Sequence, residues 1–310
     1  MSEQTHAHPR LQALIERASV RARDGRQPAV ALVHPGDRLA LAAAEAIARA
    51  GIARPVLIGV RADILAAAAM AAVDISPFEI VDTDKGGPAA ALRACELARS
   101  GDVDLLMKGS LHTDELMSAV VNKETGLRGN SRISHAFVFD LPRYHKLIAL
   151  ADCVVNIAPD LRTKRDILGN AVSLLGRIGI DRPQVGILAA VESVNPAIPA
   201  TLDAAALVQE ARAGAWPDAF VDGPFGFDNA ISAEAAAIKG IRSTVSGQAD
   251  LLIVPDLNSG NMLYKSFVYI GGGDCAGLVL GARVPVVVTS RADSQLARMA
   301  SVALGVLAIG

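Results

Sequence analysis

The stretch DLLIVPDLNSGNMLYKSFVYIGGGDCAGLVLGARVPVVVTSRADS, residues 250–294, holds the pattern from which the fold can be inferred. An apolar run at 251–254 is followed by Pro-Asp and by small polar residues at 258–261. Two further apolar runs lead into Thr-Ser-Arg at 289–291. Ligands of parallel α/β sheets bind beyond the carboxyl ends of the strands, which is where these polar groups fall. Amides, hydroxyls and a guanidinium suit an anionic, oxygen-rich ligand.

The composition favours a core of small aliphatic residues. Of the 310 residues, 51% are hydrophobic and 4% aromatic, which favours helices on a parallel sheet over an aromatic-rich β-sandwich. The net charge is -2, and no tract rich in Lys or Arg supplies the basic surface typical of nucleic-acid binding. The polar N-terminus and the interrupted apolar runs predict a cytoplasmic protein that does not span a membrane. Three cysteines without a CxxC motif fit a reducing compartment, with Cys275 a core residue rather than a catalytic thiol.

In the first part of the chain, short apolar runs alternate with segments of helical periodicity. Strands are predicted at 29–33, 55–59, 78–81 and 105–107, and helices at 9–24, 39–49, 61–71 and 88–99. This alternation is typical of βαβ crossovers and predicts mostly parallel sheets with helices on both faces. After the fourth strand Gly109 allows a sharp turn, and Ser110 and Thr113 are expected to cap the next helix.

The alternation is interrupted after residue 134 and then resumes. Two apolar runs, 135–141 and 147–151, are joined by too few residues for a helix, which predicts an antiparallel hairpin. Further strands are predicted at 154–157, 184–188 and 220–222, and helices at 162–178, 201–212, 232–239 and 293–307, with Thr201 in a helix cap. We therefore predict two α/β domains: residues 1–145 with the returning segment 286–310, and residues 146–285.

Polar side chains follow four of the predicted strands and would form one site if these strand ends face one cleft. The four sets are Lys108, Ser110 and His112; Asp222, Asp228 and Asn229; Asp256, Asn258, Asn261 and Lys265; and Ser290 with Arg291. An ammonium directly after an apolar strand, as at Lys108, would lie at the ligand-binding edge of the sheet. Arg128 is a further cation, in the polar segment 122–131 that has the composition of a loop at a cleft.

Other site chemistries are open on residue type alone. Asp222, Asp228 and Asp256 could bind a divalent cation, although strand-end aspartates are more often caps and turn formers. Ser290 is not in a GxSxG elbow, so a serine-histidine-aspartate triad lacks its usual turn. The glycine-rich segment 271–277 precedes a strand rather than a helix, which is the wrong order for dinucleotide binding.

Several segments show a family resemblance. DGPFGFDNAIS (222–232), ADLLIVPDLNSGNMLYK (249–265) and VPVVVTSRADS (284–294) resemble the phosphate acetyl/butyryltransferase family. LLMKGSLHT (105–113) resembles the GxxH turn of that family. TSRADS is most similar to the butyryltransferase-like branch and to the acyltransferase part of proteins fused to an enoyl-CoA hydratase. The resemblance covers nearly the whole chain from about His34 onward.

This resemblance implies a two-domain fold like that of isocitrate and isopropylmalate dehydrogenases, with a cleft between the domains, and a homodimer. It implies reversible transfer of an acetyl or butyryl group between coenzyme A and inorganic phosphate. Coenzyme A would be a substrate, with no metal and no tightly bound cofactor. Ser290 and Arg291 would be catalytic, the arginine holding phosphate and the hydroxyl bonding to the thioester. The residues expected to bind substrate are Lys108, Ser110, His112, Arg128, Asp222, Asn229, Asn258, Gly260, Asn261 and Lys265.

Two positions depart from the family pattern. Phosphotransacetylases have an aspartate seven residues after the serine, where this chain has Ala297. They also have an arginine in the helix after the GxxH turn, where this chain has Ser118 or Ala119. Cations such as Lys108 and Arg128 could supply the missing charge. Two alternatives stay open: a metal- and NAD-dependent dehydrogenase of a phosphorylated hydroxy acid on the same fold, and a non-catalytic module that binds coenzyme A or acyl phosphate.

Overall fold

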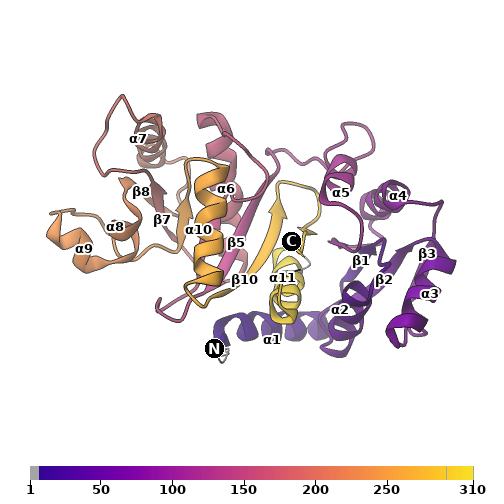
Figure 1. Cartoon of the computed structure of the whole chain (residues 1–310). Coiled ribbons are helices and arrows are strands. Elements are labelled where there is room, and N and C mark those ends of the chain that lie inside the picture. The colour runs from indigo at the N-terminus through magenta and orange to yellow at the C-terminus, as the bar shows by residue number, and fades with distance from the viewer. Residues whose placement is uncertain (1–6, 291, 310) are drawn as a thin grey trace. The chain divides into compact units, whose positions relative to one another are not determined.

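The computed structural model describes residues 7–290 and 292–309, which form two compact units (Figure 1). The terminal unit comprises residues 11–133 together with the C-terminal segment from residue 276 onward. The middle unit comprises residues 134–275 and the first described residues up to residue 10. The C-terminal segment therefore returns to the unit that the N-terminal part of the chain builds. The predicted domain boundaries at 145 and 285 stay a prediction.

The terminal unit is a mostly parallel sheet flanked by helices. Its elements are α1 (Pro9–Asp24), β1 (Ala29–Val33), α2 (Arg38–Arg49), β2 (Arg54–Gly59), α3 (Arg61–Ala71), β3 (Glu79–Asp82), α4 (Gly87–Ser100), β4 (Leu105–Lys108), α5 (Thr113–Val120), β10 (Asp274–Leu280), β11 (Val286–Val287) and α11 (Gln295–Ala308). The strand order is β3-β2-β1-β4-β11-β10, in which β10 is antiparallel to β11 and the other neighbours are parallel. All five residues of β1 are buried, as expected for a central strand covered on both faces.

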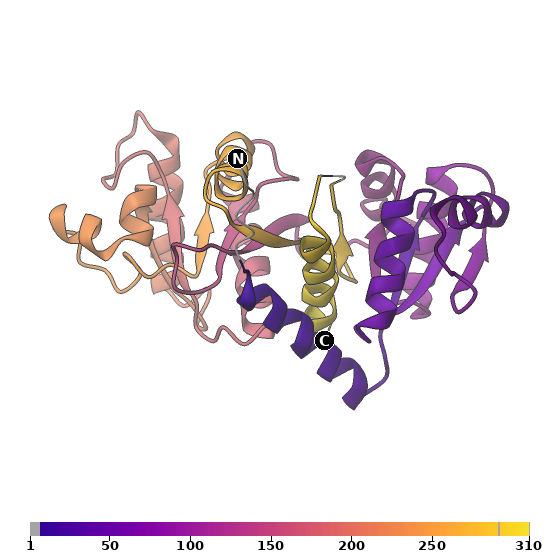
Figure 2. The ribbon, with the colours of Figure 1, turned by 60° about the horizontal axis from the view of Figure 1, so that its bottom comes forward.

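Helix α11 is the part of the C-terminal segment that fixes it to this sheet. Its residues 299–307 are buried, and it packs against α2, β4 and β11. A Cβ at Gly305 would lie 2.9 Å from Leu105 Cδ1, so the glycine lets the helix lie close to β4. At the other end of the chain, α1 passes the C-terminal end of α11, where Arg21 donates to the Leu307 carbonyl at 3.1 Å (Figure 2).

The middle unit has the same layered construction. Its elements are β5 (Ser134–Asp140), β6 (Ile148–Ala151), α6 (Leu161–Arg177), β7 (Gln184–Leu188), α7 (Pro199–Arg212), β8 (Phe220–Phe225), α8 (Phe227–Ile231), α9 (Ala233–Ile238), β9 (Leu251–Ile253) and α10 (Leu257–Tyr269). The strand order is β5-β6-β9-β7-β8. The strands β6, β9, β7 and β8 are parallel, and β5 is antiparallel to β6, which confirms the predicted hairpin. Phe139 packs edge-on against Phe267 in the core, with 5.1 Å between ring centroids.

The polar residues 258–261 form the first turns of α10, because Asp256 caps the helix and accepts the Ser259 N–H at 2.9 Å. One strand prediction in the middle unit is wrong. No strand forms at 154–157. There the carboxylate of Asp152 accepts the N–H groups of Val154 and Val155, at 2.9 and 3.0 Å, and turns the chain.

The predicted helix caps are also wrong. The residue that caps α5 is His112, not Ser110 or Thr113. Helix α7 begins with Pro199, two residues before Thr201, because proline lacks the N–H that the first helical position leaves unpaired. In each case the hydroxyl residue lies close to the helix start but not at the capping position.

Strand β8 is longer than predicted and contains Asp222. The sequence Gly223-Pro224 indicates a turn, but the strand continues through it to Phe225. Because β8 lies at the edge of the sheet, a proline without an N–H is tolerated there. Asp222 therefore lies inside a strand rather than beyond its carboxyl end.

No helix within residues 7–290 and 292–309 combines the length and the apolar character that a membrane crossing requires.

Candidate active site

Two neighbouring parallel strands of the terminal unit, β4 and β11, end at the same edge of the sheet. In their register Val286 lies beside Leu106 and Val287 beside Met107. The chain continues from β4 through Lys108, and from β11 it reaches Ser290. The structure thus brings Lys108 and Ser290 to one edge, at the carboxyl ends of parallel strands where ligands bind.

The turn after β4 is bonded to the end of β1. The N–H groups of Gly109 and Ser110 donate to the carbonyls of Val33 and His34, each at 2.9 Å. The Ser110 hydroxyl accepts the N–H of Gly36, also at 2.9 Å. A Cβ at Gly109 would lie 2.5 Å from the Val33 oxygen, so only glycine allows the two chains to approach this closely.

The same turn holds an ammonium group. Lys108 Nζ donates to the carbonyls of Gly109 and Leu111, at 3.2 and 3.1 Å, which fixes the charge above the turn. His112 follows at the start of α5 and is exposed, and its backbone N–H donates to Glu115 Oε2 at 2.8 Å. The ammonium supplies a positive charge at the sheet edge, where an anionic ligand would be attracted.

Both backbone polar groups of Ser290 are fixed. Its N–H donates to Asp293 Oδ2 at 2.6 Å, and its carbonyl oxygen accepts from Arg298 Nη2 at 2.7 Å. Its Oγ accepts the N–H of Ala292 at 3.3 Å, a bond that does not use the hydroxyl hydrogen. Because Ser290 is exposed, the sheet edge presents an oriented hydroxyl that can donate to a ligand.

The sequence patterns above do not indicate Arg298. This residue lies in the first turns of α11 and also donates from Nη1 to Thr289 Oγ1 at 3.4 Å. A cation near a helix N-terminus is disfavoured by the helix dipole. A positively charged residue in this unfavourable position is the sequence feature that could have indicated a role for Arg298.

Arg128 is exposed and lies in a loop that pairs with the turn between β10 and β11. Its backbone forms a bridge with Ala282, and the N–H of Gly129 donates to Gly281 at 3.1 Å. Its Nε donates to the carbonyl of Val121 at 2.5 Å. The guanidinium is therefore bonded to the backbone of its own loop while the residue stays accessible.

In the middle unit, the parallel neighbours β6 and β9 lead into Asp152 and Asp256. A Cβ at Gly260 would lie 2.8 Å from the Asp152 carbonyl, so this glycine lets the first turn of α10 pack onto the end of β6. Asn261 Nδ2 lies 3.5 Å from the Cys153 carbonyl. The conformation of this predicted set is thus explained by local packing, and its part in substrate binding stays a prediction.

The other predicted binding residues of the middle unit differ in their exposure to solvent. Asn258 and Lys265 are exposed on α10 and accessible to a ligand. Asp222 is half-buried and accepts the N–H of its own neighbour Gly223 at 2.9 Å. Asn229 is 0% exposed, and neither atom of its side-chain amide has a hydrogen-bond partner among the described residues. Roles in binding for these four residues also stay predictions.

A buried histidine at the start of β5 has no counterpart among the sequence predictions. His135 is 1% exposed, and neither ring nitrogen has a hydrogen-bond partner within the described chain. Burial lowers the pKa of this imidazole to about 4, although the carboxylate of Asp152 opposes the shift. The ring packs against Phe137 with 4.4 Å between centroids. His135 is therefore neutral at physiological pH.

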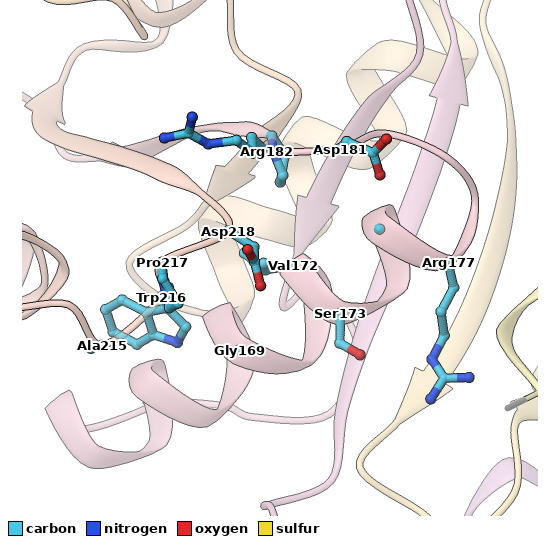
Figure 3. A pocket seen from close by; sticks show the side chains of 12 residues that line it. Gly169, Val172, Ser173, Arg177, Asp181, Arg182, Ala215, Trp216, Pro217 and Asp218 are labelled. Atoms are coloured by element: carbon cyan, nitrogen blue, oxygen red, sulfur yellow. The ribbon is translucent and has the colours of Figure 1, made fainter.

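A surface hollow of about 590 Å³ lies elsewhere in the middle unit (Figure 3). It is lined by the C-terminal half of α6 and by the segments that precede β7 and β8, so it lies toward the amino ends of these strands. Trp216 stands beside α6 near Gly169 in this hollow (Figure 3). None of the predicted site residues lines it.

Comparison with known proteins assigns the family. A family model described as phosphate acetyl/butaryl transferase matches residues 87–306. The chain belongs to this family. A phosphate acetyltransferase of Rhizobium meliloti is 49% identical over 281 residues, covering 90% of this chain and 89% of that protein. A phosphate butyryltransferase of Clostridium acetobutylicum is 38% identical over 291 residues, covering 94% and 96%.

A solved structure of the same kind has a closely similar fold. The crystal structure of a branched-chain phosphotransacylase from Enterococcus faecalis V583 matches with a TM-score of 0.80 at 27% sequence identity. The match covers 91% of this chain and 99% of that one. The match therefore includes residues of both units.

Several positions distinguish this member of the phosphate acetyl/butyryltransferase family. Ala297 is 4% exposed in α11, and its N–H donates to the helix-capping hydroxyl of Ser294 at 2.9 Å. It therefore offers no acid–base group at the position where phosphotransacetylases have an aspartate. Ser118 is exposed on α5 and Ala119 is buried. Arg291, predicted to hold phosphate, lies outside the described residues.

The metal alternative gains no support from the described part of the chain. Within it, no group of three or more His, Cys, Asp or Glu residues is arranged to hold a metal ion. Asp222, Asp228 and Asp256 in particular do not form such a group.

Proposed function

We propose that this protein transfers a short acyl group reversibly between coenzyme A and inorganic phosphate. The observation that carries the proposal is Ser290, an exposed residue whose backbone N–H and carbonyl are both hydrogen-bonded. It follows β11, the parallel neighbour of the strand β4 that ends in Lys108. Family membership supports the same reaction, since the relatives are named for acyl transfer to phosphate.

The chemistry needs alignment and charge stabilisation more than a strong acid or base. A phosphate oxygen attacks the carbonyl carbon of the thioester, forming a C–O bond and a tetrahedral oxyanion. The C–S bond then breaks, and the proton of hydrogenphosphate passes to the thiolate, giving acyl phosphate and free coenzyme A. The Ser290 hydroxyl donates to the oxyanion, and the Lys108 ammonium attracts phosphate. Because the transferred proton starts on phosphate, the reaction does not require a carboxylate at Ala297.

The substrate-binding roles of the exposed Asn258 and Lys265 belong to the same proposal, as does a phosphate contact by Arg291. We also propose that the chain acts as a homodimer, which equilibrium sedimentation would measure. Relatives named for acetyl and for butyryl transfer support acyl chains in this range of length.

The test is a thiol-release assay on the purified protein. Acetyl-, propionyl- and butyryl-CoA are each incubated with phosphate, and free thiol is followed with a disulfide reagent. We expect release that requires phosphate and that falls by about two orders of magnitude in Ser290→Ala, because one oxyanion donor is lost. No thiol release with any of the three thioesters would overturn the proposal. Unchanged release in Ser290→Ala would remove Ser290 from the mechanism.

A further inference from the structure

We infer that Arg298 is a positioning residue for acyl transfer, which holds the Thr289–Ser290 segment in its reactive conformation. This inference rests on the proposed function, because it concerns the same hydroxyl. It assigns a task to a side chain that is not part of the Ser290–Arg291 pair.

The geometry gives the first argument. The two terminal nitrogens of one guanidinium bond to consecutive residues, Nη2 to the Ser290 carbonyl at 2.7 Å and Nη1 to Thr289 Oγ1 at 3.4 Å. The planar guanidinium holds its donors at fixed angles, so two such contacts restrict the rotation of the segment more than one ammonium contact could. Thr289 is 5% exposed, so the segment is held between the core and the arginine.

The second argument comes from the backbone of Ser290. A peptide unit can rotate unless the groups on both sides of the residue are held. Asp293 Oδ2 accepts the Ser290 N–H at 2.6 Å. The Ser290 carbonyl oxygen accepts from Arg298 Nη2 at 2.7 Å and, over the longer distance of 3.2 Å, from the Asp293 N–H. Removing Arg298 would therefore leave the Ser290 carbonyl with only the longer of its two hydrogen bonds and Thr289 Oγ1 without its guanidinium contact, so the hydroxyl could change direction more easily. A misplacement of about 1 Å can cost about a hundredfold in rate when reacting groups must be aligned.

The electrostatics give the third argument. Helix α11 begins at Gln295 and is capped by the Ser294 hydroxyl, so Arg298 lies near the positive end of the helix dipole. The helix dipole does not stabilise a cation at this position. The hydrogen bonds of Arg298 to residues 289 and 290 explain its orientation instead. The same two positive groups, the helix end and the guanidinium, raise the electrostatic potential beside Ser290, where a phosphate dianion is expected.

The test compares Arg298→Gln and Arg298→Lys with the wild type in the thiol-release assay. We expect kcat of Arg298→Gln to fall about 30- to 100-fold with KM for acyl-CoA changed less than about threefold, since alignment rather than thioester binding is lost. Arg298→Lys should lie between, because one ammonium can replace only one of the two contacts. Added guanidinium chloride at millimolar concentration should restore part of kcat in Arg298→Gln but not in the wild type.

A matched control is available on α1, where Arg21 contacts the other end of α11. Arg21 also donates to backbone carbonyls, those of Leu307 and Ile309, but at the far end of α11. Arg21→Gln removes contacts of the same chemistry at Leu307, nine residues beyond Arg298, which is about 14 Å along α11 at a rise of about 1.5 Å per residue. It should keep kcat within twofold, and it should show no rescue by guanidinium.

The outcomes separate this inference from the proposed function. An inactive wild-type protein would overturn the proposed function and the inference with it. An active wild type with undiminished kcat in Arg298→Gln would overturn the inference alone. A loss of kcat matched by loss of the circular dichroism spectrum, and not rescued by guanidinium, would mean that Arg298 merely stabilises the fold and would also overturn it.

Discussion

The hydroxyl of Ser110 accepts a 2.9 Å hydrogen bond from the backbone N–H of Gly36, and so joins the chain that follows β4 to the chain that follows β1. The turn carrying Lys108 is therefore tied to a second strand end at the edge where Ser290 lies. This hydrogen bond is made by the side chain of Ser110, which belongs to the turn that follows β4.

Ser110→Ala should consequently affect both stability and activity. The loss of this one exposed hydrogen bond should lower the free energy of unfolding by at most about 1 kcal/mol, measured by urea denaturation. Thiol release should fall about tenfold, because the turn that holds the ammonium is loosened. Ser100→Ala is the control, since its hydroxyl bonds only near the end of α4 and should leave the rate unchanged. A wild-type rate in Ser110→Ala would contradict this role of the hydroxyl.

Gly109→Ala should destabilise the terminal unit strongly. The added Cβ would meet the Val33 oxygen at 2.5 Å and the His34 oxygen at 2.7 Å, both of them backbone atoms with little freedom to move. We expect a loss of about 1–3 kcal/mol in the free energy of unfolding. At Gly176, in α6, a Cβ would meet nothing within 4 Å, so Gly176→Ala should increase stability by up to about 1 kcal/mol. Equal stability of the two variants would refute the steric argument.

The buried His135 should make the protein less stable in mild acid. Its folded pKa is about 4, below the value near 6.5 of an unfolded histidine, so between these values the unfolded chain binds more protons. Stability therefore falls as the pH decreases from about 6.5 toward 4, and the full effect is about 3 kcal/mol. His135→Leu should show a shallower decline in urea midpoints between pH 7 and pH 4.5. Parallel curves for variant and wild type would show that the histidine is not the cause.

Asp256 gives a pH dependence in a lower window. The N–H of Ser259 holds the pKa of this capping carboxyl below its usual range. The stability that it contributes is therefore present above about pH 4 and is lost as the pH falls through the lowered folded value. At pH 7 Asp256→Ala should lower the free energy of unfolding by about 1 kcal/mol, whereas Asp256→Asn should keep most of the cap. Equal losses in the two variants would argue against capping as the contribution.

The regular elements were predictable because their signals are local. The ends of β1 and α3 agree with the sequence prediction at 29–33 and 61–71, since burial on both faces and helical composition are visible within the segment itself. The paired ends of β4 and β11 were predictable only in part. Polar residues after apolar runs indicated the edge, but the register that places Val287 beside Met107 depends on the whole sheet.

The errors arise where a side chain acts away from its expected position. Ser110 follows the rule for a helix cap but bonds across the sheet to Gly36, and nothing in a linear pattern shows that partner. Asp152 turns the chain at 154–157, where hydrophobicity alone favours a strand. The role of Arg298 could not be predicted from periodicity, because its partner Ser290 lies eight residues earlier, before α11 begins. Helix and strand periodicities do not predict a contact at that spacing.

The strand order of the terminal unit also determines when this unit can fold during synthesis. β4 finds its neighbour β11 only in the C-terminal segment, so an edge of β4 leaves the ribosome unpaired while the whole middle unit is still being made. An unpaired edge of this kind is a site for association between nascent chains. Ser290 belongs to the same C-terminal segment. A chain that leaves the ribosome before this segment is made therefore lacks both β11 and the Ser290 hydroxyl. An incomplete copy should therefore react slowly with thioester, while its unpaired edge favours association with other chains.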